Sequence, residues 1–131
     1  MASSDAASTK GSTQLVIAFP SSNPTTGEPL KFNMTHYTGQ HIVLATQAWG
    51  PRGLRSWSVL EFQNPNPFSG ETPPYLFQSP LNWDVPPEEV LNAVVDSGPI
   101  LQPDVVNFSN VAPLLWIAKA GPKGTVEGTK A

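Results

Sequence analysis

The chain contains no cysteine, which excludes disulfides and thiolate-based metal or catalytic sites. It also carries little charge: Asp, Glu, Lys and Arg make up 13% of its 131 residues, about half of the usual share. Phosphate backbones are bound by clustered Lys and Arg, yet residues 14–118 hold three basic side chains against eight acidic ones. The sequence therefore predicts no nucleic-acid partner.

Long apolar runs are absent as well. None approaches the roughly 18–20 residues that a membrane-spanning helix needs. The first ten residues are small and polar and lack the basic start and apolar stretch of a secretory signal peptide. We therefore expect no membrane span and an intracellular location, or a place in a virion if the chain is an assembly component.

Proline is plentiful, with 15 residues in the chain, and proline breaks helix interiors because it lacks an N–H group. Residues 30–37 alternate between apolar and polar side chains, and Thr38-Gly39 then fits the two-residue loop of a hairpin. The sequence thus predicts a mainly β, single-domain antiparallel sandwich or barrel of six or seven short strands. The expected strands cover 15–19, 30–37, 41–49, 54–62, 75–77, 105–108 and 114–118.

One short helix is expected near 86–97. Pro86 and Pro87 suit its first turn, the next two glutamates favour the positive end of its dipole, and Gly98 ends it. Its apolar stripe would be Val90, Leu91, Val94 and Val95.

Both ends of the chain lack the apolar residues needed for a core. The prediction is a flexible N-terminal tail at 1–13, a β domain at 14–118 and a flexible C-terminal tail at 119–131.

Two histidines offer the only metal candidates. If Thr38-Gly39 forms a hairpin loop, His36 and His41 face each other on one sheet surface. They are weak candidates, because a zinc site needs at least a third ligand. No nucleophile elbow or phosphate loop is present, so the sequence predicts no cofactor and no enzyme activity.

The segment 49–57 is the strongest candidate binding site. It gathers Trp49, Arg52, Arg55 and Trp57 around one turn, and Trp and Arg dominate binding hot spots. The alternative is that both tryptophans belong to the core and that the arginines only solubilise the turn. Phe68, in the Pro-rich loop 63–74, is a second candidate contact, although the loop can equally be a rigid spacer.

No motif in the chain is specific to one family. Low charge, abundant Pro, Ser, Thr and Asn, and polar ends make the composition similar to that of coat and projection domains of non-enveloped viruses. The expected function is a non-enzymatic structural or interaction domain, such as a coat, projection or accessory subunit, with a protein partner or self-association. The alternatives are a carbohydrate- or ligand-binding β-domain that uses Trp49 and Trp57, with a glycan as partner, and an enzyme on a β-scaffold.

Overall fold

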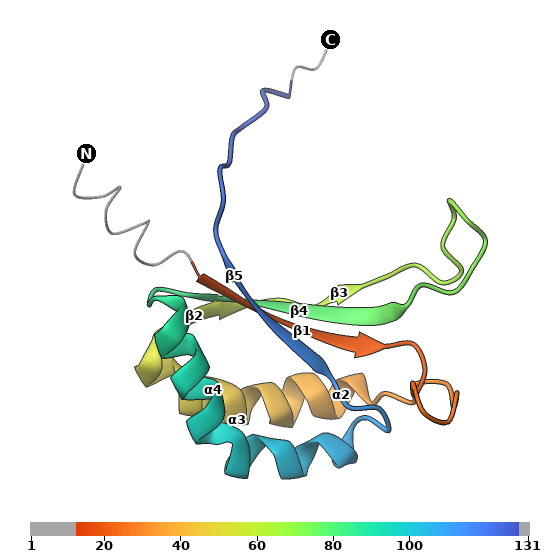
Figure 1. Ribbon diagram of the computed structural model, residues 1–131, viewed down its shortest axis with the longest axis horizontal. Coiled ribbons are helices and arrows are strands. Elements are labelled where there is room, and N and C mark those ends of the chain that lie inside the picture. The colour runs from red at the N-terminus through yellow and green to blue at the C-terminus, as the bar shows by residue number, and fades with distance from the viewer. Residues whose placement is uncertain (1–12, 129–131) are drawn as a thin grey trace.

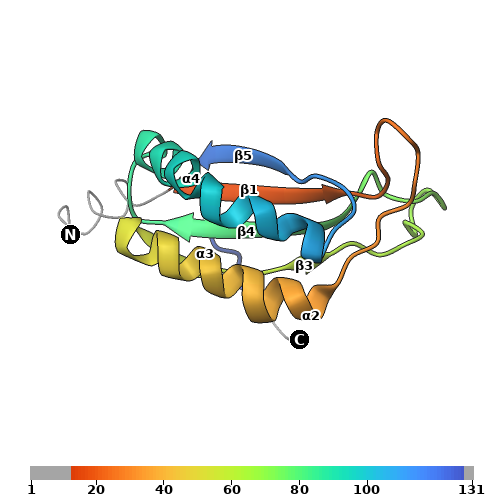
Figure 2. The ribbon, with the colours of Figure 1, turned by 90° about the horizontal axis from the view of Figure 1, so that it is seen from below.

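The computed structural model describes residues 13–128. Within this range one antiparallel sheet carries all its helices on a single face (Figures 1 and 2). The elements are β1 (Thr13–Pro20), α2 (Met34–His36), a π-helical turn (Tyr37–His41), α3 (Ile42–Trp49), a 3-10 turn (Gly50–Arg52), β2 (Leu54–Trp57), β3 (Leu60–Glu61), β4 (Tyr75–Trp83), α4 (Pro87–Leu101), a second 3-10 turn (Gln102–Asn107) and β5 (Leu114–Lys119).

The prediction of a mainly β sandwich or barrel is wrong, because the structure is α+β. The strand order is β2-β4-β1-β5, with β3 also paired to β4. The long strands β1 and β4 lie side by side in the middle, and α3 and α4 cross the same face of the sheet (Figure 2). The helices take the place that a second sheet would occupy in a sandwich.

Pro80 lies in β4 next to a gap in the neighbouring strand. Proline cannot donate to a ladder hydrogen bond, and residues 58–59, opposite this position, belong to neither β2 nor β3. The Ser58 N–H still donates to the Pro80 carbonyl at 3.2 Å. The missing donor of Pro80 thus explains why this sheet edge is divided into two short strands.

The predicted hairpin over residues 30–49 is replaced by a helical segment. The Asn33 side chain accepts a hydrogen bond from the His36 N–H and caps the start. From there Ile42, Ala45 and Trp49 follow at helical spacing and are buried against the sheet. The alternation seen over residues 30–37 is therefore not a strand, and Thr38-Gly39 lies inside the π-helical turn.

The helix expected near 86–97 is present as α4, but it runs through Gly98, the expected end, to Leu101. The expectation of a single helix is wrong, because α3 is a second one. The buried positions of α4 are Val90, Ala93, Ser97 and Leu101, whereas Leu91 and Val95 of the expected stripe face solvent. The strand expected over 105–108 is wrong, because the chain continues into the second 3-10 turn. Thr13 and the segment 120–128 are the described parts of the expected tails; residues 1–12 and 129–131 lie outside the described range.

The core lies between the sheet and the helices. Its centre is a cluster of aromatic rings whose centroids lie 4.7–5.8 Å apart. The rings are those of Phe19 in β1, Phe32 before α2, Tyr37 in the π-helical turn, Phe77 in β4 and Phe108 after the second 3-10 turn.

No helix in the described part of the chain is long and apolar enough to cross a bilayer.

Candidate ligand cavity and its histidine–aspartate cluster

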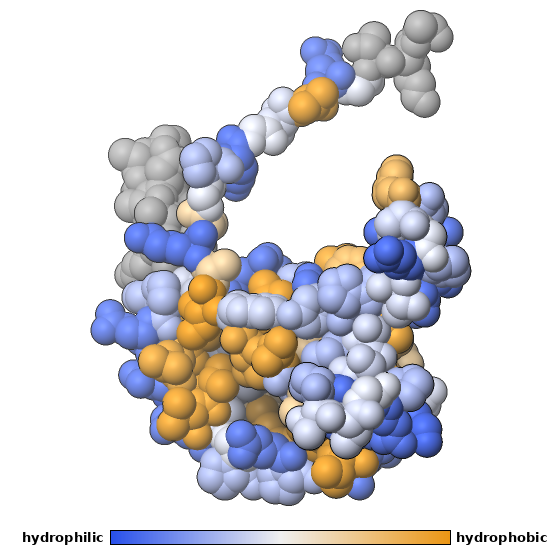
Figure 3. Space-filling model, turned by 45° about the vertical axis from the view of Figure 1, so that its right-hand side comes forward, coloured by the Kyte–Doolittle hydropathy of each residue, from blue (hydrophilic) through white to orange (hydrophobic). Residues whose placement is uncertain are grey.

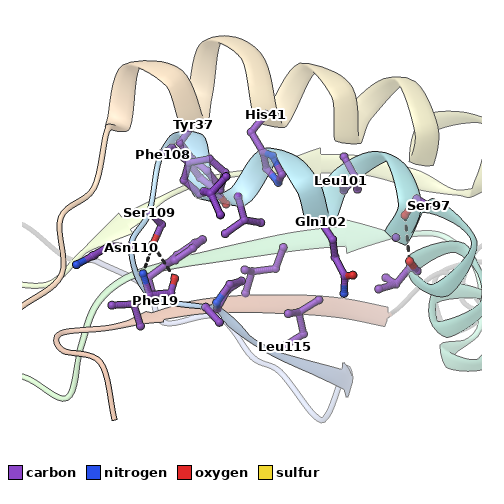
Figure 4. Close-up of a pocket in the computed structure, with 18 of the residues that line it drawn as sticks. Phe19, Tyr37, His41, Ser97, Leu101, Gln102, Phe108, Ser109, Asn110 and Leu115 are labelled. Atoms are coloured by element: carbon purple, nitrogen blue, oxygen red, sulfur yellow. Dashed lines mark hydrogen bonds between the residues drawn. The ribbon is translucent and has the colours of Figure 1, made fainter. Parts of the chain in front are cut away.

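A cavity of about 490 Å³ lies between the helical layer and the sheet. Its walls come from β1, the π-helical turn, α3, the C-terminal half of α4, the second 3-10 turn, the loop 108–113 and the start of β5 (Figure 4). Val106 and Leu115 line it and are also exposed, which places its mouth between the 3-10 turn and β5. Figure 3 shows hydrophobic side chains around a hollow in the body of the domain.

The cavity walls are mainly apolar and carry no Lys, Arg, Asp or Glu. Such a lining disfavours a charged ligand, because a buried charge without a partner is costly. The volume falls within the range of roughly 300–1,000 Å³ that is usual for small-molecule sites. The polar side chains on the walls are Tyr37, His41, Ser97, Gln102, Ser109 and Asn110.

Most of these polar side chains are already hydrogen-bonded within the protein. Ser97 accepts from the Trp49 indole at 2.8 Å, and Ser109 is bonded to both backbone groups of Val111. The Asn110 amide donates to the Pro29 carbonyl. Two groups remain for a ligand among the described residues: the Gln102 amide and one ring nitrogen of His41.

His41 belongs to a cluster around Asp104, which also includes His36 and Asn107. The Asp104 carboxylate lies 2.9 Å from His41 Nδ1 and 3.1 Å from His36 Nε2. The Asn107 amide donates to it at 2.9 Å. His36 lies in α2 and His41 ends the π-helical turn, whereas Asp104 and Asn107 both lie in the second 3-10 turn. The cluster therefore joins two helical segments that are distant in sequence.

The Asp104 cluster holds an ionised carboxylate. Burial raises the pKa of Asp104, but hydrogen bonds from Asn107, His41 and His36 outweigh it and lower the pKa from 3.8 to about 2. An ionised carboxylate only accepts hydrogen bonds. His41 must therefore carry a proton on Nδ1, and His36 must carry one on Nε2.

Tyr37 ties the π-helical turn to the sheet. Its hydroxyl is 2.7 Å from Ser79 Oγ in β4, and burial raises the pKa of Tyr37 to about 12, with the Ser79 hydrogen bond opposing that rise. Its ring stacks on His41, with centroids 5.9 Å apart. Single π-helical turns often occur at functional sites, and here the turn carries both Tyr37 and His41 into the cavity wall.

The binding site expected over 49–57 is divided between the core and the surface. Trp49 is 3% exposed and lines the cavity, whereas Trp57 lies 39% exposed on an edge strand. Arg52 pairs with Asp96 at 3.1 Å and Arg55 with Asp84 at 2.6 Å. The four side chains thus form no common platform.

Phe68 is 97% exposed in the loop 63–74, which stands away from the body of the domain (Figure 1). Phe68 is not among the residues that line the cavity. Its role as a contact stays a prediction.

The structure does bring His36 and His41 together, though not across a hairpin. They lie five positions apart on one helical segment and share Asp104. Within residues 13–128 no group of three or more His, Cys, Asp or Glu side chains has an arrangement that could hold a metal ion. Sequence reasoning missed Asp104, which is 63 positions from His41 and has no local signal that links it to either histidine.

Comparisons with known proteins place the fold. No protein-family model matches the chain. No curated protein matches it either. An EthD-like protein from Ralstonia eutropha JMP134 superposes with a TM-score of 0.67 at 18% identity, over 84% of this chain and 92% of that one. An ethyl tert-butyl ether D (EthD) family protein from Bacillus halodurans C-125 gives a TM-score of 0.58 at 17% identity, over 83% and 98%.

These similarities correct the expected function. The prediction of a coat, projection or accessory subunit of a virion rested on composition and on an expected β sandwich or barrel. The observed fold is neither a sandwich nor a barrel, and it is similar to EthD-like proteins. The alternative of a β-domain with a Trp49–Trp57 platform is wrong for the same reason. With β2 and β3 counted as the two pieces of one edge strand, the order is β-α-β-β-α-β in one open antiparallel sheet, which is ferredoxin-like. The chain thus has the α+β fold of EthD-like proteins.

Proposed function

We propose that the protein binds a small, uncharged, mainly apolar molecule in the cavity between sheet and helices, with one polar group of the ligand directed at His41. The observation that supports this is an apolar cavity of about 490 Å³ whose walls carry no charged Lys, Arg, Asp or Glu side chain. A flat aromatic ligand suits the rings of Phe19, Trp49 and Phe108 along its walls.

Three probes of similar size test the proposal: 1-naphthol, naphthalene and 1-naphthoate. Calorimetric titration should give the tightest binding for 1-naphthol, whose hydroxyl can donate to His41. One such hydrogen bond is worth about 1 kcal/mol, or roughly fivefold in affinity over naphthalene. The anion 1-naphthoate should bind weakest, and tighter binding of 1-naphthoate than of 1-naphthol would contradict the proposal.

Filling the cavity provides the matching variant. Gly98 lines the cavity, and a Cβ atom added there meets no heavy atom within 4 Å. We expect Gly98→Leu to weaken 1-naphthol binding at least about tenfold, the loss of roughly 1.4 kcal/mol. Asn92→Leu, at an exposed position of the same helix outside the cavity, is the control and should leave binding unchanged.

We also propose self-association through the open face of the sheet. The alternate residues of β1 and β4 that pack under the helices leave their neighbours pointing to the other face of the sheet. Every residue of β5 is exposed, and its register with β1 places Leu114, Trp116 and Ala118 on that same outer face. None of these outward residues is charged, so two copies can meet without burying an unpaired charge. Ala18 shares this register but is fully buried. The open-face patch consists of Gln14, Val16, Gln78, Pro80, Asn82, Leu114, Trp116 and Ala118.

A further inference from the structure

His41 and Asp104 have the arrangement of a general base with its orienting carboxylate. The His41 Nδ1 atom lies 2.9 Å from Asp104 Oδ2. Because the carboxylate is ionised, the neutral imidazole keeps its proton on Nδ1 and its lone pair on Nε2. In serine hydrolases the same relation between carboxylate and imidazole holds the ring in the tautomer that accepts a proton through Nε2.

The His41 Nε2 atom is open to the cavity. His41 lines the cavity, and its ring projects from the helical segment toward it (Figure 4). No hydrogen bond to Nε2 is formed within residues 13–128, although the residue is only 9% exposed. In that part of the chain only Trp83 Nε1 is both fully buried and without a hydrogen-bond partner. Because His41 Nε2 also has no partner, it is not fully buried and has access to free space.

A hydrogen-bond donor lies on the same walls. The Gln102 side chain lines the cavity and is directed into it in Figure 4. Within the described residues its amide has no hydrogen-bond partner, whereas the neighbouring Ser109 and Asn110 side chains are bonded to the backbone. Gln102 can therefore donate to an oxygen atom on which negative charge develops.

We infer that His41 is a catalytic base that moves a proton within a bound carbonyl compound, with Asp104 as its positioning residue and Gln102 as the donor to the carbonyl oxygen. His41 Nε2 takes a proton from the carbon next to the carbonyl. The electrons of that C–H bond form a C=C bond, and the carbonyl electrons move to oxygen, giving an enolate. The imidazolium then returns the proton to carbon or to oxygen, so the net reaction is a proton shift that needs no cofactor.

The inference rests on the proposed ligand cavity and names its substrate class: a small, uncharged ketone with an aromatic or alicyclic body and an acidic C–H bond. The expectation that the chain is not an enzyme was based on missing nucleophile motifs. A proton shift needs no nucleophile, only a base of suitable position and pKa.

Deuterium exchange of 2-tetralone tests the inference. This probe is a neutral aromatic ketone with acidic C–H bonds, and its exchange in D₂O is followed by proton NMR. A positioned general base contributes roughly 10²–10⁴-fold. We therefore expect the protein to accelerate exchange at least about 100-fold over the same concentration of free imidazole. Addition of 1-naphthol should inhibit this exchange competitively.

Variants separate catalysis from binding. His41→Gln should lower exchange to the background rate while saturation-transfer NMR still detects bound 2-tetralone. Asp104→Asn should reduce the turnover rate at least about tenfold with little change in KM, because an amide can stabilise the wrong tautomer of His41. Gln102→Leu, at an exposed position, supplies a second test if His41→Gln fails to fold. Arg52→Gln, whose ion pair lies outside the cavity, is the control.

The outcomes distinguish the two proposals. Bound 2-tetralone whose exchange is equally fast in wild type, His41→Gln and Gln102→Leu would overturn the catalytic role. If 1-naphthol binds and 2-tetralone does not, the ketone is overturned as the substrate class. Failure of both probes to bind would overturn the proposed function, and the inference with it.

Discussion

Two buried tryptophans of the core differ in one hydrogen bond. Trp49 Nε1 donates to Ser97 Oγ at 2.8 Å, whereas Trp83 Nε1 has no partner among the described residues. Their rings lie side by side with centroids 5.5 Å apart, and both are almost fully buried. An exchange to phenylalanine therefore removes similar apolar contacts from each, but only at Trp49 does it also remove a satisfied hydrogen bond.

We predict that Trp49→Phe lowers the free energy of unfolding by about 1 kcal/mol more than Trp83→Phe, the usual net value of one hydrogen bond. Urea unfolding followed by circular dichroism measures both variants without relying on tryptophan fluorescence. An equal or larger loss in Trp83→Phe would show that the unpartnered indole has a role that its hydrogen bonds do not explain.

Asp104 links the stability of the protein to pH. Its pKa in the folded protein, about 2, lies below the ordinary value of 3.8. A group with a lowered pKa stabilises the folded state above its unfolded pKa, and this contribution is lost as the pH falls toward the folded pKa. This lowering of the pKa corresponds to roughly 2 kcal/mol of stability at neutral pH.

We therefore expect Asp104→Asn to lower the free energy of unfolding by about 2 kcal/mol at pH 6, and by much less at pH 2.5. Urea unfolding of wild type and variant at both pH values measures this difference. Asp96→Asn, which removes an exposed ion pair with Arg52, is the control and should cost under about 1 kcal/mol. A difference between wild type and Asp104→Asn that stays constant from pH 6 to pH 2.5 would contradict the assignment.

At the scale of single elements, sequence patterns predicted those whose own residues determine them. The runs that form β1 and β5 are short and apolar, and α4 begins at prolines and glutamates that suit a helix start. The helical segment 34–49 was missed because its β-branched residues Ile42, Val43 and Thr46 favour strands. Packing of Ile42, Ala45 and Trp49 against the sheet outweighs that preference.

The candidate site could be predicted only in part. The sequence singled out His36 and His41 as a pair, and the structure joins them, but in a helical segment rather than a hairpin. Asp104 was unpredictable because its link to the histidines spans more than 60 residues and depends on how α4 packs beside α3. The cavity likewise arises from elements that are distant in sequence, so no local pattern could reveal it.

At the scale of the whole molecule, the sheet has one covered face and one open face. Among the described residues, every helix lies on one side of it (Figure 1). On the other side the open-face patch has apolar Val16, Pro80 and Trp116 in one row across three strands. Leu114 and Trp116 are 44% and 45% exposed, although both are large apolar side chains. Exposed apolar patches are typical of interaction surfaces, which supports the self-association proposed above.

A second copy of the chain is the occupant that we expect, because the patch is uncharged and therefore complementary to itself. We predict that sedimentation equilibrium gives a dimer for the wild type, and that Trp116→Lys raises its dissociation constant at least tenfold, since a central interface residue contributes more than about 1.4 kcal/mol. Val95→Lys, on the exposed side of α4 in the helical layer, is the matched control and should leave the dimer intact. A wild type that stays monomeric at about 100 μM, far above the micromolar dissociation constants of weak specific complexes, would leave the open face to a different partner. A dimer that Trp116→Lys does not weaken would place the contact elsewhere on the molecule.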